Sequence, residues 1–249
     1  MVPDFAANWA FFLDVDGTLL GFVESPSAVE VEPPLIRLLD ELHTLTGGAI
    51  ALISGRPIRS IDKIFSPLEL PVAGQHGFER RRASGELTSG ELDAGPLDEV
   101  RDVLRRFAEE HPGAFVEDKE VALALHFRRN PSLGPQVERL VSRLTPRLGP
   151  AFHVQFGKMV VEIRPLGRDK GMAIAEFMAE PPFEGKIPVF LGYDATDEDG
   201  FRRVKEMRGV PINVGPGHTV ASWRLDNVDT VVEWLLDYVR WFREGGTLP

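Results

Sequence analysis

The stretch Ala10-Phe-Phe-Leu-Asp-Val-Asp-Gly-Thr-Leu19 is an apolar run that breaks off at two aspartates, Asp14 and Asp16, followed by a glycine. A short run of bulky apolar residues bounded by turn formers is typical of a strand buried in a parallel sheet. Two carboxylates at the end of such a strand can converge on one divalent cation, and Gly17 allows backbone N–H groups to approach an anion. Taken alone, these residues fit a plain turn equally well, because Asp and Gly are common turn formers.

Segments on either side of this run alternate between helical and strand patterns, which sets the fold class. Residues 33–45 carry leucines at helical spacing behind two prolines, and the apolar run 49–53 predicts a second strand. Further helices are predicted at 57–65, 170–179, 198–207 and 228–243, and further strands at 187–191 and 210–214. A repeated strand-helix order predicts an α/β fold, a doubly wound parallel sheet.

Residues 80–166 break this alternation and predict a separate domain. A helix is predicted at 96–110, followed by strands at 114–118 and 121–128. A second helix is predicted at 135–148, followed by strands at 151–156 and 158–164. Period-two alternation in the last strand gives one apolar and one largely polar face. The order predicts an α+β cap, an antiparallel sheet covered on one side by two helices, inserted into a Rossmann-like core of residues 1–79 and 167–249.

Composition and charge limit the classes of protein to which the chain can belong. It has 249 residues, 43% hydrophobic and 27% charged, which is ordinary for a globular protein. The net charge of −10 argues against a nucleic-acid partner, and the absence of cysteine excludes disulfides and thiolate metal sites. No apolar run reaches membrane length, and no basic region precedes the apolar segment near the N-terminus. We therefore expect a cytoplasmic protein, favoured as a monomer, with neither a nucleic-acid nor a membrane partner.

Three further short segments either follow a predicted strand of the same sheet or begin a predicted helix that packs on it. Ser54, in Ile53-Ser-Gly-Arg56, can donate a hydrogen bond to a phosphate, although a plain Ser-Gly turn has the same pattern. Lys170 stands at a predicted helix start, where a cation is unfavourable unless a bound anion shares the helix N-terminus with it. The acidic loop 192–199 follows the strand 187–191 and also fits an ordinary helix N-terminus. Four such elements in one sheet are far less expected by chance than any one of them.

These elements resemble, in order, the four motifs of the haloacid-dehalogenase-like phosphatases. The matching residues are Asp14-x-Asp16-Gly17-Thr18, Ser54-Gly55-Arg56, Lys170 and the loop 192–199. Within that superfamily the chain is similar to the trehalose-6-phosphate phosphatases, from about residue 9 to residue 235. The supporting segments are Gly74-Gln-His76-Gly77, Glu117-Asp-Lys119 with His126-Phe-Arg128, and Gly157-Lys158-x-Val-x-Glu162-x-Arg164-Pro165.

The resemblance implies magnesium-dependent hydrolysis of trehalose 6-phosphate to trehalose and phosphate, a step of trehalose biosynthesis, through an aspartyl-phosphate. Asp14 would attack phosphorus, and Asp16 would protonate the leaving sugar oxygen and later deprotonate the attacking water. Ser54 and Lys170 would hold the transferring oxygens. Mg²⁺ would be held by Asp14, the Asp16 carbonyl and a carboxylate of the acidic loop, with Asp194 as the first candidate.

Other residues of the matching segments would bind the substrate. They are Thr18, Gly55, Arg56, His76 and Gly77 in the core, and Glu117, Lys119, His126, Arg128, Lys158 and Glu162 in the cap. In the strand 121–128, His126 and Arg128 alternate onto the same face as two alanines, which leave room for a ligand. The alternative interpretation is a solvated polar sheet face held by cross-strand ion pairs.

One position departs from the family pattern. The acidic loop of the family usually reads Gly-Asp-Asp, whereas Tyr193 stands here in place of the first aspartate. A phenol with a pKa near ~10 is a poor ligand for a hard cation, so Asp194 or Asp197 would have to take over. Two alternatives follow: a phosphatase for another sugar phosphate or a glycosyl phosphoglycerate, or a sugar-phosphate-binding homologue disabled by Tyr193.

Overall fold

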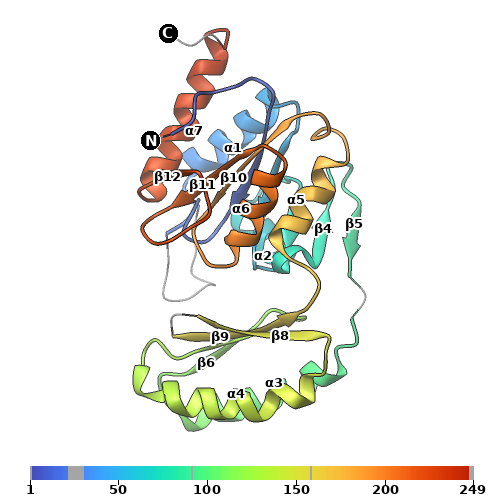
Figure 1. Cartoon of the computed structure of the whole chain (residues 1–249), viewed down its shortest axis with the longest axis vertical. Coiled ribbons are helices and arrows are strands. Elements are labelled where there is room, and N and C mark those ends of the chain that lie inside the picture. The colour runs from blue at the N-terminus through green and yellow to red at the C-terminus, as the bar shows by residue number, and fades with distance from the viewer. Residues whose placement is uncertain (1, 22–30, 91, 158, 247–249) are drawn as a thin grey trace. The chain divides into compact units, whose positions relative to one another are not determined.

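The structure, a computed structural model, describes residues 2–21, 31–90, 92–157 and 159–246. The chain divides into two compact units, a core unit of Met1–Ser89 and Asp169–Pro249 and a cap unit of Gly90–Arg168 (Figure 1). No helix within these described ranges is long and apolar enough to cross a membrane.

The core unit is built on one eight-stranded sheet. Its order is β12 (Trp223–Leu225), β11 (Val210–Val214), β10 (Ile187–Gly192), β1 (Trp9–Asp14), β2 (Ile50–Ile53), β3 (Val72–Gly74), β4 (Glu79–Arg81) and β5 (Leu87–Ser89). Neighbours are parallel from β12 to β3, whereas β4 and β5 continue the sheet antiparallel. The predicted doubly wound parallel sheet is confirmed, and β1 lies in its middle.

Helices cover both faces of this sheet because β1 is apolar on both sides. Phe11 and Leu13 face the cluster formed with α1 (Pro33–Leu45), α2 (Ile58–Phe65) and α7 (Val228–Arg243). Phe12 faces the cluster formed with α5 (Lys170–Met178) and α6 (Asp197–Glu206).

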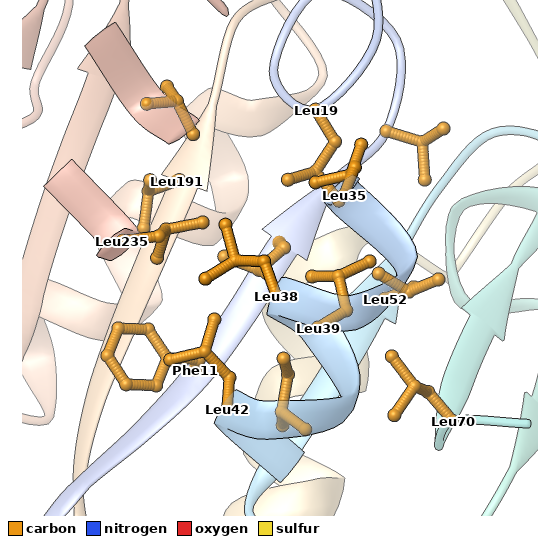
Figure 2. Close-up of a cluster of buried hydrophobic side chains, with 14 of the residues drawn as sticks. Phe11, Leu19, Leu35, Leu38, Leu39, Leu42, Leu52, Leu70, Leu191 and Leu235 are labelled. Carbon is orange, nitrogen blue, oxygen red and sulfur yellow. The ribbon is translucent and has the colours of Figure 1, made fainter. Parts of the chain in front are cut away.

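Helix α1 shows how the sequence produces this packing. Leu35, Leu38, Leu39 and Leu42 recur at helical spacing, all are buried, and they point toward Phe11 and Leu52 of the sheet (Figure 2). Burying each leucine contributes about 1.5–3 kcal/mol before the entropy of ordering it is counted.

The cap unit is a four-stranded antiparallel sheet with helices on one face, which confirms the predicted α+β cap. The strand order is β6 (Phe115–Asp118), β7 (Leu123–His126), β9 (Val160–Pro165) and β8 (Phe152–Gly157). Helices α3 (Gly95–Glu110) and α4 (Gly134–Leu148), the latter entered through the turn η3 (Pro131–Leu133), pack their buried residues on Leu123, Leu125 and Ile163. The opposite face of the sheet is polar.

The boundary predicted at residue 79/80 differs from the structure. The sheet of the core unit continues through β4 and β5, so the division falls after Ser89. These strands escaped prediction because each has three residues, and β4 consists of charged residues only, without apolar alternation. The second division falls after Arg168, close to the predicted residue 166.

Candidate active site

The end of β1 brings a buried carboxylate into contact with side chains from distant parts of the chain. Asp14 is 3% exposed, and its Oδ2 accepts a hydrogen bond of 3.0 Å from the Thr18 hydroxyl. Its Oδ1 accepts from Lys170 Nζ at 2.8 Å, and the same ammonium donates to Asp197 Oδ1 at 2.7 Å. One buried ammonium therefore bridges two buried carboxylates at the carboxyl edge of the parallel sheet.

Local sequence explains why these three groups meet. Because β1 and β10 are parallel neighbours, Asp14 and the loop after Gly192 leave the sheet at the same edge. A Cβ on Gly192 would lie 2.5 Å from Asp197 Cγ, so a glycine is required for that carboxylate to approach the strand end. Lys170 opens α5, whose N-terminus is capped by the Asp169 side chain.

Burial and mutual repulsion determine the charges in this cluster. Burial raises the pKa of Asp14 well above its usual value, the charge of Asp197 raises it further, and Lys170 only partly offsets both. Burial likewise raises the pKa of Asp197 to about 6, against the lowering effect of Lys170. Burial alone lowers the pKa of Lys170, but the surrounding carboxylates outweigh it and hold that pKa well above its usual range. The lysine is therefore a fixed cation in a site with an excess of negative charge.

Two carboxylates of the acidic loop, Asp194 and Asp197, have different surroundings. Asp197 Oδ2 accepts from the backbone N–H groups of Tyr193 at 2.8 Å and Asp194 at 2.9 Å, so both of its oxygens are engaged. Asp194 is exposed, and its Oδ1 accepts from the Thr196 N–H at 2.7 Å. The protein atoms around Asp194 raise its pKa, but Lys170 and Thr196 outweigh this effect and lower it below the usual value. Asp194 is thus an ionised carboxylate, and no described residue donates to its second oxygen.

The second aspartate of the motif is held by an arginine from the next strand end. Arg56 donates from Nε and Nη2 to the two carboxylate oxygens of Asp16, at 2.7 and 2.6 Å. Its own backbone N–H donates to the Ser54 hydroxyl at 3.1 Å. A bidentate pair fixes both the position and the plane of a carboxylate, so the segment after β2 orients Asp16.

A left-handed turn places a histidine beside this segment. In η2 (Gln75–Gly77), Gln75 and His76 have φ of 48° and 57°, a conformation that non-glycine residues rarely adopt and that concentrates at functional sites. His76 Nε2 would lie 2.7 Å from a Cβ on Gly55, so only glycine fits at that position. The imidazole is also close enough to Asp194 to contribute to lowering its pKa.

These observations agree with what the chain matches among known proteins. The family model described as trehalose-phosphatase matches residues 12–229, which include Asp14, Arg56, Lys170 and Asp197. The chain belongs to the trehalose-phosphatase family. It is a phosphatase, a hydrolase of phosphoric monoesters.

Similar proteins and a similar solved structure agree with the assignment of this phosphatase to the family. The trehalose-6-phosphate phosphatase of Escherichia coli is 41% identical over 233 residues, which are 94% of this chain and 87% of that protein. A probable trehalose-phosphate phosphatase of Sinorhizobium fredii is 42% identical over 209 residues, 84% of this chain and 78% of that protein. The solved C-terminal domain of C. albicans trehalose-6-phosphate phosphatase superposes with a TM-score of 0.84 at 27% identity, covering 94% of this chain and 92% of that domain.

The donors at the sheet edge of the phosphatase fit a sparsely coordinated hard cation. No three His, Asp or Glu side chains converge on one point in the described ranges, so a cation would not be enclosed by side chains alone. Mg²⁺ does not require this, because it keeps several waters and is commonly bound by one or two carboxylates and substrate phosphates. Asp14, Asp194 and the Asp16 carbonyl provide oxygen donors in a site with excess negative charge. Each Asp14 oxygen accepts one hydrogen bond, whereas Asp197 accepts three and is the more fully engaged carboxylate.

The polar face of the cap sheet carries four of the six cap residues that the sequence assigned to substrate. Lys119 Nζ contacts Glu162 Oε1 at 2.7 Å, with both side chains about one-seventh exposed or less (13% and 14%). His126 Nε2 lies 3.0 Å from Glu117 Oε2, and its ring stacks on Phe115 with centroids 4.5 Å apart. Cross-strand register confirms that Glu117 and Glu162 flank the same residue of β7. The face thus offers paired donors and acceptors.

Some predicted residues fall outside this arrangement, and others were missed. Lys158 lies outside the described residues, and Arg128 is exposed in the turn after β7. Arg164, whose Nε donates to Gln155 at 3.3 Å, lies on the polar face and was not assigned to the site. The alternation of 158–164 could have identified Arg164. Nothing in the sequence could have identified Asp197 as the partner of Lys170, because that contact depends on packing.

A hollow of about 430 Å³ is lined by residues of the cap helices α3 and α4 and shares no residue with the carboxylate cluster of the core. Its lining residues are Val103, Arg106, Phe107, Glu110, His111, Gln136, Arg139, Leu140 and Arg143.

Proposed function

We propose that this phosphatase hydrolyses trehalose 6-phosphate to trehalose and phosphate, with Mg²⁺ as its cofactor. The observation that carries the proposal is the buried Asp14–Lys170–Asp197 chain at the end of β1, in a member of the trehalose-phosphatase family. The names of the E. coli and C. albicans proteins support the choice of substrate.

In the first step, an Asp14 oxygen attacks phosphorus, a P–O bond to Asp14 forms, and the P–O bond to the sugar breaks. Thr18 and Lys170 hold the carboxylate that attacks, and Lys170 is close enough to offset charge on the transferring oxygens. When bound, Mg²⁺ supplies positive charge that lowers the repulsion between carboxylate and phosphate. Asp14, Asp194 and the Asp16 carbonyl would hold it.

Asp16 acts on the leaving group and then on water. It gives a proton to the sugar oxygen as that bond breaks, and it takes a proton from the water that attacks the aspartyl-phosphate, which restores Asp14 and releases phosphate. In the free protein both Asp16 oxygens accept hydrogen bonds from Arg56. Arg56 must therefore release one of these oxygens when that oxygen carries the proton for the sugar.

In this proposal the cap unit recognises the sugar part of the substrate. A disaccharide requires donors and acceptors directed at its hydroxyls, and the Lys119–Glu162 and His126–Glu117 pairs supply both on one sheet face. None of these groups belongs to the carboxylate cluster of the core unit. They determine which phosphate ester is used and leave the chemistry to the core.

Phosphate release from a substrate panel tests the proposal. Trehalose 6-phosphate, glucose 6-phosphate, a glycosyl phosphoglycerate and an aryl phosphate are compared with and without Mg²⁺. We expect kcat/KM for trehalose 6-phosphate to exceed the other sugar phosphates by about 10² or more, since a site built to hydrogen-bond hydroxyls rejects substrates that lack them. A preference for another ester would overturn the substrate, and undiminished rates after metal removal would overturn the cofactor.

A further inference from the structure

Strand β4 consists of three charged residues, Glu79-Arg80-Arg81, and lies between β3 and β5 in the sheet of the core unit. Arg80 is 5% exposed, and Arg81 and Glu79 are half-buried. Burying a charge costs free energy unless the charge is paired and hydrogen-bonded. The charged side chains of β4 therefore require partners of opposite charge or hydrogen-bond acceptors and donors around them. Alternation along the strand sends Arg80 to one face of the sheet and its two neighbours to the other.

On the first face, Arg80 anchors α5, the helix that begins with Lys170. Its Nη1 contacts Glu180 at 2.8 Å, its Nε contacts Glu176 at 3.3 Å, and the guanidinium lies 5.0 Å from the centroid of the Phe177 ring. All three contacts are at the C-terminal end of α5.

The other end of α5 is held by close backbone approach. A Cβ on Gly77 would lie 2.9 Å from the Asp169 carbonyl and 3.1 Å from Ala173 Cβ, so η2 packs directly on the first turn of the helix. Held at both ends, α5 cannot slide along its axis without breaking one attachment. Its axial position is what places Lys170 Nζ between Asp14 and Asp197.

On the opposite face, Glu79 and Arg81 anchor α2, the helix that follows Arg56. Glu79 Oε2 accepts from the Ile58 N–H at 3.2 Å, and its Oε1 accepts from the side-chain amide of Gln75. Arg81 forms a bidentate pair with Asp62 of α2 at 2.7 and 2.9 Å. The Gln75 backbone N–H in turn donates to the Arg56 carbonyl at 3.0 Å.

We propose that the charged strand β4 is the positioning element of the catalytic site: Arg80 places Lys170 through α5, and Glu79 with Arg81 places Arg56, the partner of Asp16, through α2. The inference rests on the proposed roles of Asp14 and Asp16 but not on the identity of the sugar. The residues of β4 touch neither of these aspartates, so they are positioning residues. A displacement of about 1 Å transmitted to a reacting group can cost about 10²-fold in rate.

The two halves of the strand give different kinetic signatures. Lys170 serves every phosphate ester, so Arg80→Met should lower kcat/KM about 10- to 100-fold on trehalose 6-phosphate and on p-nitrophenyl phosphate alike. It should also weaken inhibition by orthovanadate, a phosphoryl mimic. Asp16 is needed most where the leaving group requires a proton. Glu79→Gln should therefore lower kcat/KM on the sugar ester at least about tenfold more than on the aryl ester.

Leu39→Ala on α1 is the stability-matched control, because it removes core packing far from both attachments and costs about 2–5 kcal/mol in such sites. Below its melting temperature it should retain wild-type kcat/KM and vanadate inhibition within about twofold. Glu180→Gln, just past the end of α5, removes the ion pair with Arg80 together with a contact to Arg82, and it replaces Arg80→Met if that variant does not fold.

The inference would be overturned if Arg80→Met or Glu180→Gln lost as much stability as the control but kept wild-type kinetics. It would also be overturned if Glu79→Gln lost activity equally on both esters. If the wild type hydrolyses only the aryl ester, the proposed substrate fails, while the Arg80 arm is still decided by the aryl ester and by vanadate.

Discussion

At the residue scale, the site is a balance of charge around Asp14. Three carboxylates, Asp14, Asp194 and Asp197, act on the ammonium of Lys170, and the pKa of Asp14 is raised first by burial and then by the negative charge of Asp197. Such a cluster suits a cation and a phosphoryl transfer better than it suits stability. Two substitutions test this assignment.

Asp14→Asn should lower turnover by at least about 10⁴-fold while the protein stays folded, because an amide cannot act as the nucleophile and its shape is nearly unchanged. Phosphate release and far-UV circular dichroism check the two statements. A structure with beryllofluoride should show the mimic against Asp14 in the wild type only. Substantial turnover by the purified variant would rule out an aspartyl-phosphate.

Tyr193→Asp should lower the Mg²⁺ concentration for half-maximal activity, by about tenfold, since affinity of hard-cation sites follows the number of ligand charges. The Tyr193 ring lies 3.1 Å from a Cβ position on Gly215, and the backbone N–H of Tyr193 donates to Asp197. Asp194→Asn is the opposite control and should raise the requirement. Coincident Mg²⁺ titrations for wild type and Tyr193→Asp would show that the position is neutral for metal binding.

At the element scale, α5 depends on a glycine where it crosses α6. A Cβ on Gly171 would lie 2.5 Å from the Asp199 carbonyl and 2.9 Å from Arg203 Cβ, and backbone cannot give way there cheaply. Gly171→Ala should therefore destabilise the protein by about 1–3 kcal/mol and, by moving Lys170, lower kcat by about 10²-fold. Thermal melts and phosphate release measure both effects.

The matched control is Gly134→Ala in the first turn of α4, where the nearest side-chain atom would lie at 3.8 Å and the backbone is helical. Alanine there should be neutral or stabilising, by up to about 1 kcal/mol. Equal losses for the two glycine variants would contradict the steric explanation.

Helix α7 links stability to alkaline pH through Tyr238. Burial raises the pKa of Tyr238 to about 12, and its hydroxyl donates to the Ala6 carbonyl at 3.2 Å. Between pH 10 and 12 the unfolded chain loses this proton and the folded chain keeps it, so the stability that is fully present below pH 10 is lost as pH rises. Over this range the free energy of unfolding should fall with pH in both proteins, and the slope for the wild type should be steeper than that for Tyr238→Phe by about 1.4 kcal/mol per pH unit.

Denaturant titrations from pH 9 to 12 measure this slope. Tyr193→Phe removes an exposed phenol and should leave the slope as in the wild type. The same slope for the wild type and Tyr238→Phe would show that the buried phenol does not control alkaline stability.

What the sequence could predict at this scale depended on the length and periodicity of the element. The pattern at 228–243 and the run at 210–214 coincide with α7 and β11, because many apolar positions fix their period. Strand β4 offered no such signal, since three charged residues in a row indicate a surface turn and are buried here only through partners on α2 and α5. The motif residues were predictable by resemblance. The Arg56–Asp16 pair was not, because it joins positions 40 residues apart.

At the scale of the whole molecule, the proposal assigns chemistry to the core unit and selectivity to the cap unit. Glu162→Ala or Lys119→Ala should lower kcat/KM for trehalose 6-phosphate by about 10- to 100-fold and leave hydrolysis of a small aryl phosphate within about threefold. Each substitution removes one member of a pair on the polar cap face and none of the residues around Asp14. Steady-state kinetics on the two esters measure the difference. Arg105→Ala, which removes a half-exposed arginine and its contact with Asp118, should affect neither.

Equal losses on both esters for Glu162→Ala would mean that the cap face serves folding of its unit and not recognition. The polar face itself was predictable, because period-two alternation assigns faces without knowledge of the partners. Which donors pair with which acceptors was not, since that depends on the register β6-β7-β9-β8.

The split core has a consequence for synthesis on the ribosome. In the register of β1 with β10, Trp9 pairs with Ile187, so one edge of the central strand has no partner until most of the chain has been made. At roughly 5–20 residues per second, β1 waits on the order of ten to forty seconds with both apolar faces incompletely covered. The cap unit is contiguous and can fold during this interval, but an unpaired apolar strand invites association between nascent chains. We therefore expect the yield of folded enzyme in a cell to depend on translation speed and chaperone supply as well as on the stability of the finished protein.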